Sequence, residues 1–161
     1  MLKYSLFLTL FGVEMSSKTL FEVSKNNANR VRKEIAVEFF NLISSGRPKD
    51  GLRFFATDCK THNPYTVGGV KELIDAMIAV QKQGSKGIIQ GSTADFKLII
   101  RQVLAEGDLV VVHTQISGSN PSAGGLRQVH IFRFSGDKIV EYWDITQMIP
   151  ENMPNAAGAF S

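Results

Sequence analysis

Residues 128–147, with the sequence QVHIFRFSGDKIVEYWDITQ, restrict the fold of this chain more than any other segment. Apolar and polar residues alternate up to the short segment SGDK at residues 135–138, and they alternate again after it. Two such runs around a turn rich in Ser, Gly and Asp are typical of a β-hairpin. We therefore predict two antiparallel strands whose side chains point alternately to the two faces of a sheet.

The length of the hairpin loop decides which residues of the two strands lie opposite each other. A loop of residues 136–138 sets these pairs opposite each other: Phe134 with Val140, Phe132 with Tyr142, and His130 with Asp144. Directly opposed residues share a face of the sheet, so we expect His130 beside Asp144 on an aromatic face. A two-residue loop would shift the pairing by one residue and set His130 against Trp143.

An aspartate on that aromatic face would be partly removed from water. Desolvation raises the pKa of a carboxylic acid toward the range that is useful for proton transfer. The His130 imidazole could orient the Asp144 carboxylate, share its proton, or protonate an oxygen of a substrate. The alternative is that Asp144 pairs with a surface Lys or Arg, and that His130 is a half-buried residue with satisfied hydrogen bonds.

Several other side chains are candidates for lining a ligand site. His62 lies in THNPY, at an extended strand end that can reach into a cavity or form a solvated turn. His113 and Gln115 follow Leu109 and Val111 on one face of a strand, which suits a pocket mouth or an edge or dimer contact. The predicted ligand-binding residues are His62, His113, Gln115, Phe132, Tyr142, Trp143 and Gln147.

Composition limits the class of protein. The chain has 161 residues, enough for one domain, and its 43% hydrophobic and 20% charged residues are ordinary for a soluble globular protein. The net charge of +3 is dispersed, so the sequence does not predict a nucleic-acid surface. The single cysteine, Cys59, can form neither an internal disulfide nor a Cys/His metal site, and we expect it to be a buried small residue.

The N-terminus carries an apolar run over residues 4–13, which is too short to span a bilayer. It resembles the apolar region of a signal peptide, but no clear small-residue cleavage site follows it. We interpret residues 1–25 as an N-terminal extension and residues 26–161 as a single domain. A cytoplasmic location without membrane attachment is our expectation, and a weak signal segment is the alternative.

Hydrophobic periodicity and turn signals predict the remaining elements. We expect helices over residues 26–44, 50–56 and 70–83, and strands over residues 59–63, 94–105, 109–116, 126–134 and 139–148. The stripe of the first helix begins at Val31 and continues through Ile35 and Phe39. This order predicts an α+β fold, in which a curved, mostly antiparallel sheet wraps around N-terminal helices and leaves a central pocket.

The sequence lacks the common nucleotide and zinc motifs. No G-x-G-x-x-G follows a predicted strand, and G-x-x-x-x-G-K-[ST], G-x-S-x-G and H-E-x-x-H are all missing. We therefore expect neither a nucleotide cofactor nor a metal ion.

Residues from Arg30 to Phe160 carry a family resemblance. Its markers are VEFFNLISSG, the THNP step, GDLVVVHTQ, the IFRFSGDKIVEYWDITQ hairpin and the closing PENMPNAAGAF. With these segments the chain resembles the SnoaL-like polyketide cyclase family of the nuclear transport factor 2-like superfamily. The resemblance implies a cone-like α+β barrel with a deep pocket, commonly homodimeric through its sheet.

The resemblance also implies a chemistry. SnoaL-like cyclases close polyketide rings by intramolecular aldol condensation without metal or cofactor, using an aspartate and a histidine that match Asp144 and His130. This chain departs from the family pattern at Tyr142 and Gln115, where relatives often have histidine, and some relatives have a carboxylate at the position of His130.

These observations lead to three functional hypotheses. The first is a cofactor-independent lyase, isomerase or cyclase that acts on a small apolar carbonyl compound, with Asp144 as base and His130 as acid, assisted by His113 or Gln115. The second is a non-catalytic module that binds an apolar ligand. The third is a dimerisation domain whose pocket is filled by Phe and Trp side chains. A buried Asp144 near His130 favours the first, and a salt-bridged or solvated Asp144 favours the second.

Overall fold

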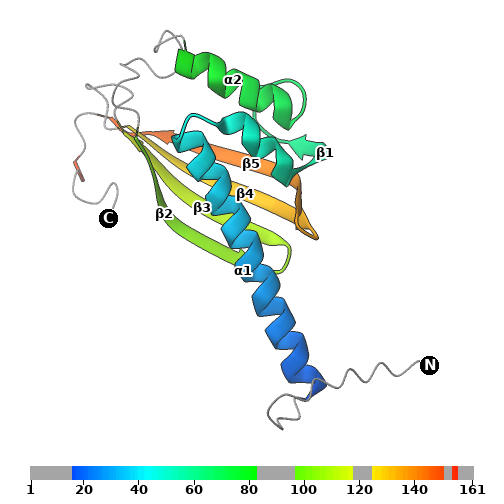
Figure 1. The fold of residues 1–161 in the computed structure, drawn as a ribbon. Helices are drawn as coiled ribbons and strands as arrows, with labels where there is room; N and C mark the ends of the chain where they lie inside the picture. The colour runs from blue at the N-terminus through cyan, green and yellow to red at the C-terminus, as the bar shows by residue number, and fades with distance from the viewer. Residues whose placement is uncertain (1–15, 83–96, 118–124, 151–153, 156–161) are drawn as a thin grey trace.

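The structure is a computed structural model that describes residues 16–82, 97–117, 125–150 and 154–155 (Figure 1). The apolar run at residues 4–13, most of the predicted loops at 84–92 and 117–125, and nearly all of the C-terminal tail lie outside the described residues. The described elements follow the order helix, 3-10 helix, strand, helix and four strands.

Helix α1 spans Ser17–Ser44 and therefore begins earlier than the predicted boundary at residue 26. Ser16 caps it, because its hydroxyl oxygen accepts a hydrogen bond from the backbone N–H of Thr19. The first turns of α1 project beyond the sheet in Figure 1. Val31, predicted to belong to the buried stripe, is 37% exposed, so the stripe is buried only nearer the C-terminal half of the helix.

Three short elements follow α1. The predicted second helix is a 3-10 helix, η1, over Pro48–Phe54. Strand β1 spans Phe55–Thr61, so it begins before the predicted residue 59. It pairs in parallel with the last strand. Helix α2 spans Val70–Lys82, close to its predicted bounds.

The sheet has five strands in the order β1-β5-β4-β3-β2. The pairs formed by strands β2 (Lys97–Glu106), β3 (Leu109–Ser117), β4 (Leu126–Ser135) and β5 (Lys138–Met148) are all antiparallel, and only the β1–β5 pair is parallel. The sheet is not closed, since β1 and β2 are its edges. Helix α1 crosses one face of this curved sheet, which we call the inner face (Figure 1). The predicted α+β class and mostly antiparallel sheet are confirmed.

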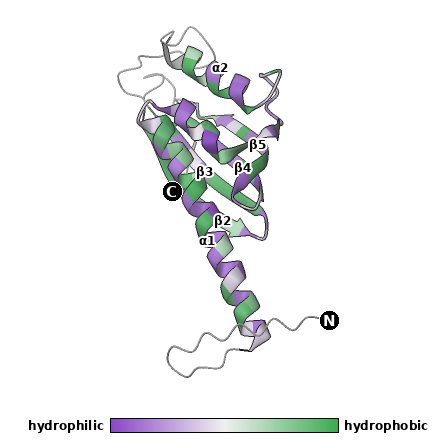
Figure 2. Ribbon diagram, turned by 45° about the vertical axis from the view of Figure 1, so that its right-hand side comes forward, coloured by the Kyte–Doolittle hydropathy of each residue, from purple (hydrophilic) through white to green (hydrophobic). Residues whose placement is uncertain are grey.

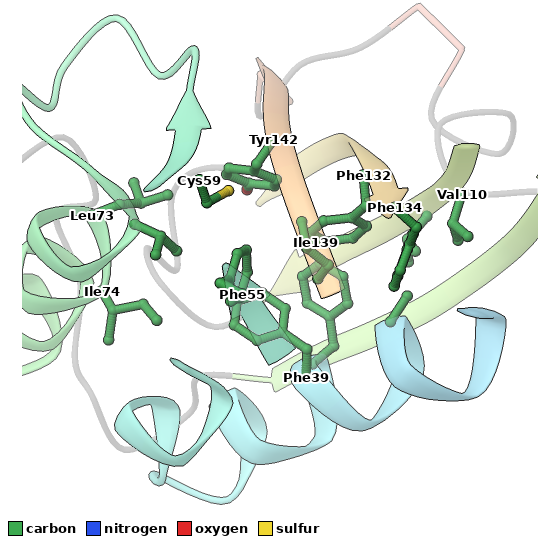
Figure 3. Packing of buried hydrophobic residues seen from close by; sticks show 14 of the residues in the cluster. Phe39, Phe55, Cys59, Leu73, Ile74, Val110, Phe132, Phe134, Ile139 and Tyr142 are labelled. Carbon is green, nitrogen blue, oxygen red and sulfur yellow. The ribbon is translucent and has the colours of Figure 1, made fainter. Parts of the chain in front are cut away.

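Aromatic side chains fill the space between α1 and the inner face. Figure 3 shows Phe39 from α1, Phe55 from β1 and Phe132 from β4 pointing into the same space. Ring centroids of Phe39 lie 5.2 Å from Phe55 and 6.0 Å from Phe132. Figure 2 shows hydrophobic and hydrophilic residues alternating along α1, as expected for an amphipathic helix with one face on a core.

Candidate functional site

His130 and Asp144 lie opposite each other in the β4–β5 hairpin, but the predicted loop is not the reason. Ser135 pairs with Lys138, so the turn holds two residues, Gly136 and Asp137, and the predicted three-residue loop is wrong. Phe134 consequently lies opposite Ile139 and not Val140.

A β-bulge then restores the expected register. The pairing shifts between Arg133 and Phe134, because Val140 is an extra residue in β5. The predicted pairs of Phe132 with Tyr142 and of His130 with Asp144 are therefore confirmed. The bulge has the same effect on the register as one more residue in the turn would have had.

Asp144 is half-buried on the inner face, and a neutral amide holds it. Nδ2 of Asn63 lies 2.9 Å from each carboxylate oxygen of Asp144. The side-chain oxygen of Asn63 in turn accepts a hydrogen bond of 2.9 Å from the backbone N–H of Tyr65. The Asn63 side chain is thus fixed at both ends, with its N–H groups directed at the carboxylate.

Asn63 was not among the predicted site residues. The available signal was its place before Pro64, because a residue before proline is restricted to extended conformations. Strand alternation along THNP indicates that His62 and Asn63 point to opposite faces, but it does not indicate which of the two points inward. That choice depends on how β1 pairs with β5, where Thr61 lies beside Tyr142.

His130 is 2% exposed and forms hydrogen bonds with two hydroxyl groups. Its Nδ1 lies 2.8 Å from the Tyr142 hydroxyl and its Nε2 lies 3.1 Å from Oγ1 of Thr114. Burial without a charged partner lowers the pKa of His130 from 6.5 to about 3, so the ring is neutral at physiological pH. Both ring nitrogens are engaged by Tyr142 and Thr114, and Asp144 is held by Asn63 instead.

Tyr142 links the two parts of the site. It lies two residues before Asp144 on the same face of β5, and it is buried. Burial, and secondarily the negative charge of Asp144, raise the pKa of Tyr142 well above 10. The hydroxyl therefore stays protonated and donates or accepts hydrogen bonds as a neutral group.

The buried neutral imidazole predicts a pH-dependent stability. Between pH 6.5 and about 3 the unfolded chain binds a proton at residue 130 that the folded chain does not. The free energy of unfolding should therefore fall, as pH drops through this range, by up to about 1.4 kcal/mol per pH unit from this group. The free energy of unfolding, measured with urea at several pH values, should change less steeply with pH for His130→Gln than for the wild type. An imidazole that titrates near pH 6.5 by NMR in the folded protein would contradict this.

Five predicted ligand-binding residues lie on the outer face of the sheet, away from Asp144. Strand alternation gives this result: the buried residues of β3 and β4 include Val112, Thr114 and His130, and their direct chain neighbours point the other way. The outward residues are His62, His113, Gln115, Trp143 and Gln147. Phe132 lies in the aromatic core, and Tyr142 bonds His130 there.

The outward residues form two groups. His62 stacks on Trp143 with ring centroids 4.7 Å apart, and its Nε2 lies 2.9 Å from a carboxylate oxygen of Glu141. Gln115 accepts hydrogen bonds from the guanidinium of Arg101. Burial lowers the pKa of His113, and the positive charges of Arg127 and Arg101 lower it further. None of these contacts involves Asp144.

Three further features of the described ranges bear on a site. Among their residues, no three His, Cys, Asp or Glu side chains gather in a way that could hold a metal ion. No helix within those ranges combines the length and hydropathy needed to cross a bilayer. A shallow depression with a volume of about 290 Å³ is lined by α1 alone, from Arg30 to Asn41, on its side facing away from the sheet, and so does not include Asp144.

Comparisons with solved structures agree with the fold. AclR, a candidate hydroxylase from Streptomyces galilaeus, is similar with a TM-score of 0.58 and 16% identity over 74% of this chain and 90% of that one. A candidate ketosteroid isomerase from Kribbella flavida has a TM-score of 0.57 and 16% identity, covering 78% of this chain and 84% of that one. A candidate polyketide cyclase from Sinorhizobium meliloti has a TM-score of 0.52 and 16% identity, covering 70% and 94%.

At such low identity these likenesses concern the fold alone, and the three proteins carry different activity names. No curated protein matches the sequence. The family model for the SnoaL-like domain matches residues 36–142, which is more than half of the chain and includes α1 from Ala36, His130 and Tyr142. On this match, and on the helix-then-sheet architecture that surrounds Asp144, the chain belongs to the SnoaL-like domain family.

Proposed function

We propose that the protein is a cofactor-independent acid/base enzyme that removes a proton next to the carbonyl group of a small organic compound. One observation carries the proposal: the Asp144 carboxylate is half-buried on the inner face and is held by an amide rather than by a cation. Among the described residues, Asp144 takes part in no ion pair.

The amide partner suits a general base. A nearby Lys or Arg would stabilise the anion by charge, lower its pKa and make it a weaker base. The N–H groups of Asn63 orient the two oxygens and add no net charge to the site. A fixed carboxylate can then approach a substrate C–H bond in one geometry.

The proposed reaction starts with transfer of a proton from the carbon next to the carbonyl to Asp144. The electron pair of the broken C–H bond becomes an enolate. In an isomerisation, the Asp144 carboxylic acid returns the proton to a different carbon. In an aldol-type cyclisation, the enolate attacks a second carbonyl of the same molecule and the proton goes to the new alkoxide. One carboxylate serves as base and then as acid in either case.

His130 acts in this proposal as a neutral positioning group. Its ring forms hydrogen bonds with the Tyr142 hydroxyl on one side and the Thr114 hydroxyl on the other, which fixes two polar groups on the face of the sheet that also carries Asp144. Phe132 stacks against Tyr142 with ring centroids 5.1 Å apart and keeps that chain of hydrogen bonds dry. A dry, fixed polar chain holds its geometry during proton transfer.

Deuterium exchange tests the proposal without knowledge of the natural substrate. 2-Tetralone has acidic protons next to its carbonyl, and their replacement in D2O is followed by proton NMR. We expect exchange above the buffer rate in the presence of the protein, and loss of that excess in Asp144→Asn. Binding of 2-tetralone without any protein-dependent exchange would contradict catalysis and favour the second candidate, a non-catalytic ligand-binding module. The aromatic rings that fill the centre of the domain fit instead the third hypothesis, a dimerisation domain with a filled pocket.

We further propose that the chain forms a homodimer through the outer face of the sheet. This face presents aliphatic side chains from adjacent strands, including Val111, Val129 and Ile131, which are only half-buried, and Ile145, which is 61% exposed. Half-exposed apolar surface on a sheet indicates an interaction surface.

Ile131 lies between Val111 and Trp143 in the pairing and so lies at the centre of this face. Ile131→Lys should convert the dimer to a monomer in light-scattering chromatography, because an unpaired charge at the centre of an interface is costly to bury. Val23→Lys is the matched control, since Val23 is an exposed residue of α1. A wild-type protein that is monomeric at micromolar concentration would overturn the dimer proposal.

A further inference from the structure

A row of uncharged polar side chains crosses the inner face next to Asp144. Thr114, Gln128 and Thr146 lie opposite one another on β3, β4 and β5. The row is one step along the strands from the pair of His130 and Asp144, toward the end of the sheet where β3 and β5 end. Further along the same strands the inner face is apolar again, at Ile116, Leu126 and Met148.

Two members of this row keep capacity for a ligand. Gln128 Nε2 donates a hydrogen bond of 2.9 Å to Oγ1 of Thr146. Within the described part of the chain, the other polar atom of the Gln128 amide and the hydroxyl proton of Thr146 have no partner. Thr146 is exposed and Gln128 is half-buried, so both can be reached, whereas Thr114 is buried and bonds His130.

The charges on this face restrict what can bind there. The three arginines of β2 to β4, Arg101, Arg127 and Arg133, occupy outer-face positions. Among the described inner-face residues of β2 to β5, Asp144 is the only carboxylate, none is a Lys or Arg, and His130 is neutral. An anionic substrate would meet a carboxylate and no cation on this face, so the surface favours an uncharged ligand.

The spacing of the two rows restricts the size of the ligand. Residues two apart on a strand are separated by about 6.6–6.8 Å. A ketone with its acidic carbon at Asp144 therefore reaches Gln128 and Thr146 only if it carries a second oxygen at a comparable distance. A multi-ring compound with a remote hydroxyl or carbonyl group spans this distance, and a three-carbon ketone does not.

We propose that Gln128 and Thr146 form a recognition pair for a second, uncharged oxygen of the substrate. This inference rests on the proposed function, in which Asp144 removes the proton. It adds a polar contact to the ligand expected from the sequence, which was a small apolar carbonyl compound.

The test compares 2-tetralone with 6-hydroxy-2-tetralone, which adds one hydroxyl on the far ring. Binding is measured by NMR titration, and proton loss by deuterium exchange. The wild type should bind and exchange the hydroxylated ketone about tenfold better, as expected for one or two added hydrogen bonds. In Gln128→Leu and Thr146→Val this preference should fall to about one. The carboxylated analogue, 6-carboxy-2-tetralone, should bind at least about tenfold more weakly than the hydroxylated one.

Gln147→Leu is the matched control, because Gln147 lies on the outer face opposite Arg127 and should retain the wild-type preference. No preference for the hydroxylated ketone in the wild type, or an unchanged preference in both inner-face variants, overturns the recognition pair. Asp144-dependent exchange would survive that result. A binding preference that depends on Gln128, without any exchange, supports the pair and contradicts the proposed catalysis.

Discussion

Replacing Asp144 by asparagine is expected to lower the protein-dependent deuterium exchange of 2-tetralone by about 10²–10⁴-fold, the usual contribution of a positioned general base. An amide has nearly the same shape as a carboxylate but does not accept a proton at neutral pH. The change also replaces one carboxylate oxygen by an NH2 group that cannot accept from Asn63 Nδ2, so one of the two contacts at 2.9 Å is lost. The exchange rate is measured by the loss of the proton NMR signal next to the carbonyl.

The fold of this variant should stay intact. Asp144 is half-buried, with a hydrogen bond of the kind that contributes about 1 kcal/mol, so the free energy of unfolding should change by about that amount. Asp58→Asn is the matched control, because Asp58 is an exposed residue of β1 and should retain wild-type exchange. Exchange at the wild-type rate in Asp144→Asn, with Asp58→Asn also active, would remove Asp144 from the mechanism.

The largest effect on stability is expected from Phe132→Ala. Phe132 has no exposed surface, and its ring centroid lies between 5.1 and 6.5 Å from those of five neighbouring aromatic rings. The rings belong to Phe39, Phe40, Phe55, His130 and Tyr142, from four different elements. Truncation leaves a cavity that these rings cannot all collapse into, and it should cost about 3–5 kcal/mol in urea unfolding.

Phe21→Ala is the control for this prediction. Phe21 lies on the projecting part of α1 and is 66% exposed, so the same truncation should change the free energy of unfolding by less than about 0.5 kcal/mol. Equal losses in the two variants would mean that the aromatic cluster does not stabilise the domain in the way described. A larger loss in Phe21→Ala, dependent on protein concentration, would instead indicate that the projecting helix is covered in an oligomer.

The hairpin shows how far local sequence reasoning reaches. Alternation predicted both strands within a residue or two, and the pairing of His130 with Asp144 is confirmed. The reason for that pairing was wrong, since the turn has two residues and Val140 is bulged. A bulge depends on how a strand bends and twists against its neighbours, and no local pattern in residues 139–141 marks it.

The outer-face residues show a second limit. Alternation placed His113 and Gln115 on one face of β3, together with Leu109 and Val111, as the structure has them. It did not show that this face points away from α1. The run LVVV is apolar at both parities, so either face of β3 could have been the buried one. Packing of Val110, Val112 and Thr114 against the core decides it.

The start of helix α1 and the strand order show a third limit. The apolar spacing in α1 predicted a helix, but its extension to Ser17 follows from the Ser16 cap and not from burial. The parallel pairing of β1 with β5 joins residues about 80 positions apart, and Asn63 reaches Asp144 only through it. Contacts of such long range leave no periodic signal in either segment.

By itself, the sequence determined that this chain forms helices followed by a mostly antiparallel sheet, whose last hairpin has His130 on one strand and Asp144 on the other, because side-chain alternation and turn residues are local properties. The bulge at Val140, which brings the two side chains onto one face, is not marked in the sequence. Only the tertiary structure decided what those two residues touch. The core takes His130 out of water and pairs it with two hydroxyl groups, while the distant strand β1 supplies the amide that holds Asp144. The partners of a buried polar group are set by which elements pack around it, and that is a property of the whole fold.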